Sequence, residues 1–209
     1  MIPVKILAVR YLANAAPALC RGLGVPEGYH ALGMLTTDCD DATYIALDAA
    51  TKAADVQVCY SRSFYAGAAN ASTPYAGEVI GILAGATPGA VKSGMEAALS
   101  ALQRSGFEET AGVPYLAHPV SSVGSFLAAE AGINVGSALS YLIAPPLESM
   151  YAMDAALKAA DVKLCKLYAP PSETNFGGGL LGGTQSACEA AAAAFRDAVA
   201  EVAAAPRRG

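Results

Sequence analysis

Two stretches of the chain group residues that could bind an ion. Residues 38–41 read DCDD and place three carboxylates in four positions, as a calcium loop does. An EF-hand, however, needs glycine at its sixth position and glutamate at its twelfth, where this chain has Thr43 and Ala49. Residues 177–184 read GGGLLGGT and lack the Lys-Ser/Thr pair with which a P-loop binds nucleotide phosphates and magnesium. Neither stretch therefore predicts calcium or nucleotide chemistry.

The other candidates for catalysis are two histidines and a group of serines. His30 and His118 have no cysteine or carboxylate nearby at the spacing of zinc ligands. His118 precedes Pro119 in a strand-like segment, where a structural histidine is commoner than a general base. Helix caps and turns explain Ser121, Ser122 and Ser125. We therefore expect no catalytic residue, no metal and no cofactor, and we do not expect an enzyme.

Composition limits the partners that the chain could have. Its 209 residues are 54% apolar, which is enough for a buried core. With 13 basic and 18 acidic residues the net charge is −5, and no cluster of cations exists beyond Arg207 and Arg208, so a nucleic-acid groove is not expected. Uninterrupted apolar stretches are shorter than the roughly 18 residues that a membrane helix needs. No secretory signal is evident at the start, and we expect a cytoplasmic protein without membrane contact.

The chain repeats itself. Residues 48–59 (DAATKAADVQVC) and 154–165 (DAALKAADVKLC) share nine of twelve positions at an offset of 106. The likeness continues in residues 81–87 (GILAGAT) and 178–184 (GGLLGGT). We therefore predict two copies of one unit, at residues 1–108 and 109–209. The five cysteines form no CxxC pair and leave an odd count, which favours reduced, buried thiols over disulfides.

Within each copy, strand and helix periods alternate. Strands are expected at residues 4–9, 32–37, 56–60 and 79–83, and helices at residues 14–23, with Asn14 as N-cap, and at residues 49–54. A longer helix should begin at Pro88 and bury Val91, Met95, Leu99 and Leu102. The corresponding stripe of the second copy is Cys188, Ala192, Phe195 and Val199. The expected fold class is α+β, with a small antiparallel sheet and flanking helices in each copy.

Both copies carry motifs that resemble those of the bacterial microcompartment (BMC) shell proteins. The segment KAADV, at residues 52–56 and again at 158–162, resembles the family's fingerprint before a strand. Residues 31–34 (ALGM) and 89–92 (GAVK) resemble two further family segments, and the second copy matches them loosely. The strand and helix that lead each copy resemble the circularly permuted branch. The resemblance implies two tandem, circularly permuted BMC domains.

What the resemblance implies about function is a structural role. Three two-domain chains would form a homotrimeric, pseudohexameric disc, and discs would tile with one another and with other shell proteins into microcompartment shell facets. The family's edge lysine maps to Lys52 and Lys158, whose ammonium groups could donate to carbonyls of a neighbouring tile. As ordinary helix lysines, both would simply lie in solvent.

Two long stretches rich in small residues, 61–77 and 169–183, are expected to lack secondary structure. Because glycine permits large backbone changes, we predict that these stretches line gated pores for small polar molecules. The predicted pore residues are Tyr65, Gly67, Asn70, Asn175, Gly177, Gly178 and Gly179. The alternative is that both stretches are long surface loops.

The resemblance also implies a binding site for a small amino alcohol such as ethanolamine. The family's ligand residues map to Asp40, Glu78, Phe107 and Thr174. The carboxylates would bind the ammonium group, Phe107 would wall the pocket and Thr174 would meet the hydroxyl. Otherwise, Asp40 and Glu78 cap helices or lie in solvent. A soluble, tandem-domain regulator or small enzyme built around this acidic pocket remains the competing hypothesis.

Overall fold

The computed structural model describes residues 1–64, 78–170 and 175–207. The chain divides into two units. The N-terminal unit comprises Pro3–Gly106 and Gly124–Leu127, and the C-terminal unit comprises Met1–Ile2, Phe107–Val123 and Ala128–Gly209. Helix α4 (Ser125–Ala131) therefore begins in the N-terminal unit and ends in the C-terminal unit.

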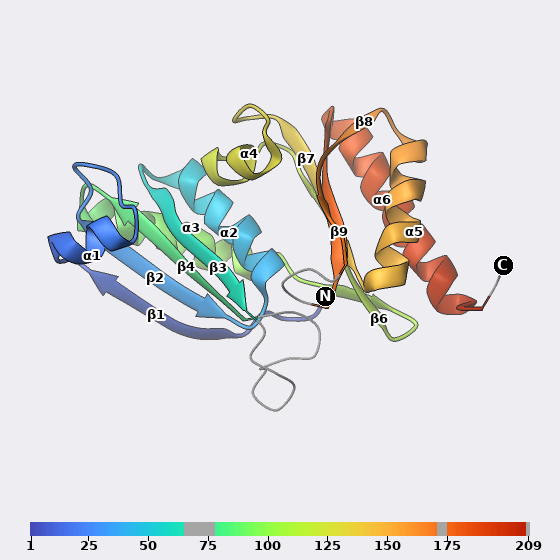
Figure 1. Ribbon diagram of the computed structural model, residues 1–209, viewed down its shortest axis with the longest axis horizontal. Helices are drawn as coiled ribbons and strands as arrows, with labels where there is room; N and C mark the ends of the chain where they lie inside the picture. Colours follow the sequence, from blue (N-terminus) through green and yellow to red (C-terminus); the bar gives the residue numbers. More distant parts are fainter. Residues whose placement is uncertain (65–77, 171–174, 208–209) are drawn as a thin grey trace. The chain divides into compact units, whose positions relative to one another are not determined.

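The N-terminal unit is built on an antiparallel sheet with the strand order β1-β2-β4-β3 (Figure 1). Its strands are β1 (Ile6–Leu12), β2 (Ala31–Thr37), β3 (Gln57–Phe64) and β4 (Glu78–Gly85). Two glycines let helices approach the sheet closely. A Cβ at Gly33 would lie 2.8 Å from Val91 Cγ1, and one at Gly81 would lie 2.6 Å from Leu47 Cδ1. Small residues in the central strands thus set the distance between the sheet and its helices.

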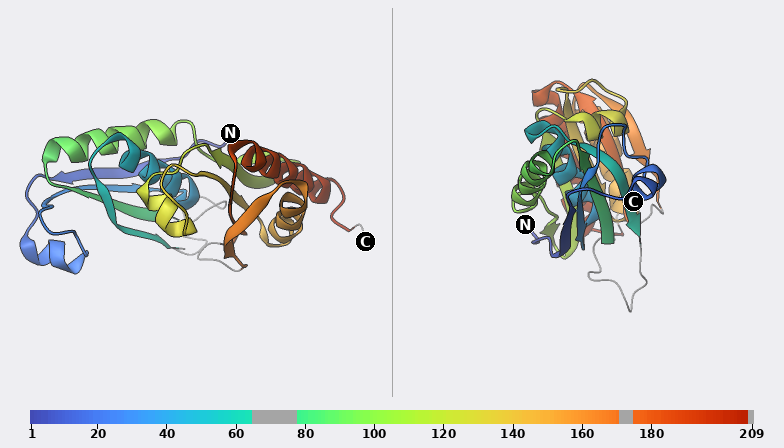
Figure 2. Two further views of the ribbon diagram at one scale, coloured as in Figure 1. Left: turned by 90° about the horizontal axis from the view of Figure 1, so that it is seen from above. Right: turned by 90° about the vertical axis from the view of Figure 1, so that its left-hand side faces the viewer.

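Helices α2 (Asp40–Ala53) and α3 (Pro88–Leu102) pack against each other and against the sheet. Thr87 caps α3 by accepting the N–H of Ala90 at 3.1 Å, and Pro88 occupies the first turn, as expected. Of the predicted stripe on α3, Leu99 is only partly buried, and the others are buried. Helix α1 (Pro17–Gly22) lies on the opposite side of the sheet (Figure 2). Ala15, Cys20 and Leu23 pack there with Leu32, Ile82 and Ala84, so part of this second face is covered as well.

The C-terminal unit repeats this architecture. Its sheet has the order β5-β6-β7-β9-β8, with β5 (Glu108–Thr110), β6 (Val113–Val120), β7 (Ala138–Ala144), β8 (Val162–Tyr168) and β9 (Gly177–Gly183). Helices α5 (Pro146–Ala159) and α6 (Gln185–Ala204) pack against each other, and the predicted stripe on α6 is buried. Even the register shifts correspond, between Val58 and Tyr60 in one copy and between Leu164 and Lys166 in the other. The expected α+β class is confirmed.

The expected strands are found with shifted ends, but both predicted short helices of the first copy begin at the wrong residue. Helix α1 begins at Pro17, with Ala16 rather than Asn14 at the cap. Pro17 presets the first turn, and the N–H of Ala15 donates to the carbonyl of His30 at 2.8 Å. Helix α2 begins at Asp40 rather than at residue 49. The helix dipole favours carboxylates in a first turn, and burial of the alanine-rich face outweighs the weak propensity of Thr43.

The prediction that residues 169–183 form a loop is wrong over its second half. Gly177–Gly183 form β9, which pairs with both β7 and β8. Glycine disfavours strands intrinsically, but here it is required by close packing, because a Cβ at Gly179 would lie 2.4 Å from the carbonyl oxygen of Lys166. The stretch 61–77 likewise begins in β3, which ends at Phe64, and its remaining residues up to 77 lie outside the described part of the chain.

Candidate functional site

The two predicted edge lysines lie at equivalent positions in the last turns of α2 and α5. Lys52 pairs with Asp48 one turn earlier, with Nζ 3.3 Å from Oδ2, and Lys158 pairs with Asp154 in the same way at 2.5 Å. Both lysine side chains are exposed. The two aspartates, by contrast, have very different surroundings.

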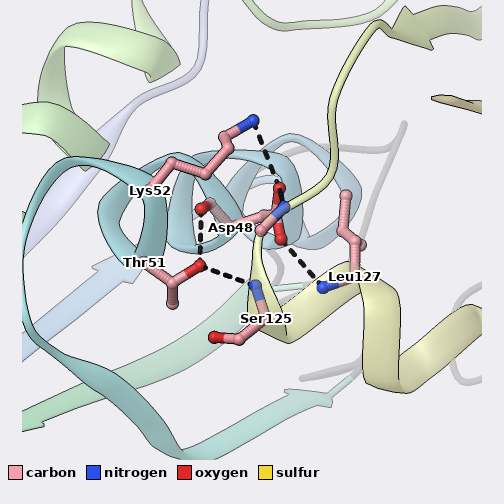
Figure 3. Close-up of polar contacts among 6 residues, drawn as sticks. Asp48, Thr51, Lys52, Ser125 and Leu127 are labelled. Atoms are coloured by element: carbon pink, nitrogen blue, oxygen red, sulfur yellow. Dashed lines mark hydrogen bonds and ion pairs between the residues drawn. The ribbon is translucent and has the colours of Figure 1, made fainter. Parts of the chain in front are cut away.

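Asp48 is the centre of a buried cluster, shown in Figure 3. Its side chain is 1% exposed, and its two carboxylate oxygens accept backbone N–H groups from the start of α4. Oδ2 accepts from Gly124 at 2.8 Å, and Oδ1 accepts from Leu127 at 2.9 Å. Two N–H donors and the ammonium of Lys52 therefore compensate the burial of this charge.

Thr51 extends the same cluster. Its hydroxyl donates to the carbonyl of Asp48 at 2.8 Å and accepts the N–H of Ser125 at 3.2 Å (Figure 3). The contact requires glycine at position 124, because a Cβ there would lie 2.3 Å from Thr51 Oγ1 and 2.7 Å from the carbonyl oxygen of Asp48. Residues 124–127 are thereby fixed to α2 within the N-terminal unit.

Asp154, the counterpart of Asp48, lies on the surface. Its side chain is 64% exposed, and Lys158 is its ion-pair partner. An exposed pair at this spacing contributes only about 0.3–0.5 kcal/mol. The same Asp-Ala-Ala-x-Lys sequence thus forms a buried clamp in one copy and a solvated pair in the other.

The predicted ligand residues Asp40 and Glu78 both belong to the N-terminal unit. Asp40, in the first turn of α2, is buried and accepts a 2.5 Å hydrogen bond from Ser63 Oγ and another from the backbone N–H of Asp41. Glu78 begins β4 and pairs with Phe64, whereas Ser63 pairs with Val79. Because side chains alternate along a strand, Glu78 is directed to the face of the sheet opposite to Ser63 and Asp40.

The other two predicted ligand residues lie elsewhere. Phe107 is buried in the C-terminal unit, where its ring lies 5.5 Å from that of Phe176. Thr174 falls outside the described residues. The strand register therefore separates the side chains of Asp40 and Glu78, and the four-residue site remains a prediction.

The predicted pore residues are divided in the same way. Tyr65, Gly67 and Asn70 fall outside the described residues, whereas Asn175 is exposed shortly before β9. Gly177, Gly178 and Gly179 are buried within β9 rather than in a loop. Their predicted role at a pore remains a prediction.

Burial disfavours the reactive thiolate form of two cysteines. Burial, together with the nearby carboxylate of Asp41, raises the pKa of the Cys39 thiol well above its usual value, and burial raises the pKa of Cys59 to about 11. Thiols with raised pKa values are poor nucleophiles and poor metal ligands. Residues 1–64, 78–170 and 175–207 contain no group of three or more His, Cys, Asp or Glu placed to bind a metal. Among these residues there is also no helix long and apolar enough to span a bilayer.

The aspartate clamp is the feature that sequence reasoning missed. Asp48 and Asp154 recur four residues before Lys52 and Lys158, a spacing that indicates an ion pair on a helix surface. The other signal of a close contact in the sequence was the glycine at position 124, between Val123 and Ser125. Nothing in the spacing indicates that Asp48 binds backbone groups 76 and 79 residues away.

Comparison with known proteins places the chain in one family. The BMC domain family matches residues 31–114. The chain is 53% identical to the bacterial microcompartment shell protein EutL of Clostridium perfringens, over 99% of this chain and 97% of that protein. It is 44% identical to EutL of Escherichia coli K12, over 97% and 94% of the two chains. The crystal structure of the ethanolamine utilization protein EutL from Leptotrichia buccalis superposes with a TM-score of 0.94 at 53% identity and covers 100% of this chain and 98% of that one.

Proposed function

Since the chain belongs to the EutL branch of the bacterial microcompartment shell proteins, we propose that three copies form a tile of an ethanolamine-type shell. The tile forms shell facets in the cytoplasm and has no catalytic activity of its own. The observation that carries this proposal is the repeat, because both copies present an exposed lysine at the same point of the same helix.

The repeat explains how such a tile is built. Permuted BMC domains at residues 1–108 and 109–209 make each chain a pair of similar corners. Three chains around a three-fold axis then give six corners, the outline that a flat hexagonal layer requires. Fusion also frees the copies to diverge, as the buried Asp48 and the exposed Asp154 have done.

Lys52 and Lys158 form the edge of the tile. Each ammonium group pairs with a carboxylate one turn earlier and lies on an exposed side chain. An ammonium group has three N–H donors, which suits it to bind carbonyl groups of the adjacent tile. Replacing both by glutamine removes the charge and shortens the reach. We expect this double variant to remain a folded trimer and to lose the ordered sheets that the unmodified chain forms, as seen by negative-stain electron microscopy.

Lys92→Gln is the matched control. Lys92 is an exposed lysine of α3 in an equivalent pair with Glu96, at 3.9 Å, and it has no part in the proposed edge. Sheets that persist in the Lys52/Lys158 variant, or that vanish equally in the Lys92 variant, would contradict the edge assignment. A chain that is monomeric at high concentration and binds or converts a metabolite would instead support the competing regulator or enzyme.

Pores through the tile pass small polar molecules. The proposed lining is the stretch 65–77, with Tyr65, Gly67 and Asn70, together with the stretch that precedes and begins β9, with Asn175, Gly177, Gly178 and Gly179. The exposed position of Asn175 beside the start of β9 supports its assignment. Rearrangement of these stretches opens and closes the pore.

Ethanolamine binds at Asp40, Glu78, Phe107 and Thr174 and regulates the pore. The buried carboxylate of Asp40 supports a site for its ammonium group. Binding shifts the pore loops towards one state only if that state has the higher affinity.

Titration calorimetry tests this site. We expect ethanolamine to bind more tightly than ethylamine, which lacks the hydroxyl, or ethylene glycol, which lacks the ammonium. Asp40→Asn should weaken binding at least tenfold, whereas Asp55→Asn, which alters a surface carboxylate bonded to Tyr29, should not. Equal affinities for the three compounds would rule out the assigned contacts.

A further inference from the structure

Two cysteines of the N-terminal unit lie in the apolar layer between α1 and the sheet. Cys20 belongs to α1, and Cys59 belongs to β3, an edge strand of the sheet. Both side chains pack against one small cluster, whose buried members are Ala15, Leu32, Ile82 and Ala84. The helix and the strand thus each contribute one thiol to the same layer.

The contacts of the two sulfur atoms lie within this cluster. Cys20 Sγ donates to the carbonyl oxygen of Ala15 at 3.9 Å, and Cys59 Sγ donates to that of Ile82 at 3.5 Å. Burial is the main cause of the raised pKa of Cys59, and the charge of Cys20 adds to it, an electrostatic effect that weakens with distance. Both cysteines are free thiols and half-buried. The two sulfur atoms therefore lie in one small region of the layer.

An irregularity in β3 gives Cys59 freedom to move. Val58 and Tyr60 pair with consecutive residues of β4, so Cys59, which lies between them, is the extra residue of a β-bulge. A bulge leaves its extra residue unpaired in the ladder and redirects the side chain. A disulfide needs a specific separation of the two Cβ atoms, and a residue outside the ladder can adjust towards it more easily than a paired one.

The second copy keeps the strand cysteine but has alanine in place of the helix cysteine. Cys165 lies at the equivalent register shift, in β8. The turns after α1 and α4 have the same backbone conformation at an offset of 108 residues, with φ of 67° at Gly24 and 64° at Gly132. At this offset Cys20 corresponds to Ala128. Cys165 is therefore a matched single-thiol control within the same chain.

We propose that Cys20 and Cys59 form a redox-sensitive pair, which closes into a disulfide on oxidation and fastens α1 to β3. The oxidant is a low-molecular-weight disulfide. The Cys20 thiolate attacks one of its sulfur atoms, which releases one thiol and leaves Cys20 in a mixed disulfide. Cys59 then loses its proton to solvent and attacks the Cys20 sulfur, which releases the second thiol. Two cysteine thiols are thus oxidised, and the external disulfide is reduced to two thiols.

The order of the two steps follows from the surroundings of Cys59. Its pKa is raised to about 11, so little of its thiolate exists near neutral pH and it is a poor first attacker. In the second step its target is no longer a dilute reagent but the sulfur of Cys20, held in the same layer. Closure is therefore slow, and it is specific for the cysteine that shares this layer.

The disulfide replaces a weak attachment of α1 by a covalent one. Helix α1 has six residues, which is too short for a helix to be stable by itself, and every one of them has at least partial exposure. In the reduced chain the layer around Ala15, Cys20 and Leu23 holds it on the sheet. A bond between positions 20 and 59 closes a loop of about 40 residues and restrains the local opening of α1.

Oxidation followed by peptide mapping tests the pair. The full chain is incubated in glutathione buffers of increasing disulfide content, its remaining thiols are alkylated, and it is digested with trypsin. Cys20 and Cys59 fall in separate tryptic peptides, residues 11–21 and 53–62. We expect these two peptides to be linked, with a mass two hydrogen atoms below their sum, and to separate on reduction. Cys165 should remain alkylated.

Three variants define the outcomes. Cys20→Ser and Cys59→Ser should each abolish the linked peptides, and Cys165→Ser should leave them unchanged. Free thiols that persist at positions 20 and 59 at the highest disulfide content, or glutathione on Cys20 with Cys59 still free, would show that the two sulfur atoms do not meet. Equal linkage to the other three native cysteines would indicate non-specific oxidation. Each of these results overturns the proposal.

Hydrogen exchange measures the attachment of α1 separately. The N–H groups of Cys20 and Leu23 donate to carbonyl groups one turn earlier, at 3.1 and 3.0 Å. In the oxidised chain, exchange over residues 17–23 should slow roughly tenfold or more, while exchange over α4 stays the same. Oxidised Cys59→Ser should show no slowing. Equal exchange of α1 before and after closure would contradict the attachment, and neither result depends on the proposed trimer.

Discussion

Removing the carboxylate of Asp48 should release residues 124–127 from α2. In Asp48→Ala, the N–H groups of Gly124 and Leu127 lose acceptors at 2.8 and 2.9 Å. A hydrogen bond to a charged group contributes about 1.5–3 kcal/mol, and both donors would remain buried without that partner. Because neighbouring contributions are not additive, we expect a loss of about 3–5 kcal/mol in the free energy of unfolding.

Urea unfolding of the full chain, at one fixed protein concentration, measures this loss. With a slope of about 2–3 kcal/mol per molar urea, the midpoint should fall by roughly 1–2 M. Hydrogen exchange adds a local measurement, since the amides of Gly124 and Leu127 should lose protection while those of α3 keep theirs. Asp48→Asn retains one acceptor and should lie between the unmodified chain and the alanine variant.

Glu96→Ala is the matched control, because Glu96 is an exposed member of an i, i+4 pair in the same unit. Its cost should be below about 0.5 kcal/mol. An Asp48→Ala variant that is no less stable than this control, or that retains the protection of both amides, would refute the clamp.

Three further predictions concern the core. The hydroxyl of Tyr115 donates to Glu108 at 2.7 Å, and burial together with this carboxylate raises the pKa of Tyr115 to about 12. The contribution of the Tyr115 hydroxyl to the free energy of unfolding is therefore complete below pH 10 and is lost as the pH rises towards 12. Tyr115→Phe should therefore cost about 1–3 kcal/mol at pH 8, and its urea midpoint should approach that of the unmodified chain above pH 10; a constant difference would contradict this. Gly178→Ala should lower the midpoint by more than about 1 M urea, since φ is 147° and a Cβ would collide with the carbonyl oxygen of Leu142; an unchanged midpoint would exclude that packing. Cys39, whose thiol pKa is raised, should react with iodoacetamide at pH 8 far more slowly than after unfolding in urea, and equal rates by mass spectrometry would exclude its burial.

The repeat and the amphipathic helices were predictable because their signals are local. Buried positions at helical spacing located α3 and α6, and Pro88 marked the start of α3. The start of α2 was not predictable in this way. Its first turn carries Asp40 and Asp41, and its helical state depends on tertiary packing of the alanine-rich face.

Strand β9 shows why a glycine-rich composition led to the wrong prediction of a loop. A run of glycines is typical of a loop, yet here the absence of a side chain lets β9 lie close to Lys166 and Leu142. The candidate site was predictable in part. The edge lysines follow from the repeat, whereas the burial of Asp48 depends on Gly124, a residue distant in sequence whose position only the fold determines.

The mass of the purified full chain in solution tests the central claim most directly. If two copies of one unit let three chains close into a ring, sedimentation equilibrium at micromolar concentration should give three times the 21.0 kDa mass of one chain. A particle of 21.0 kDa that persists as the concentration is raised would contradict the account.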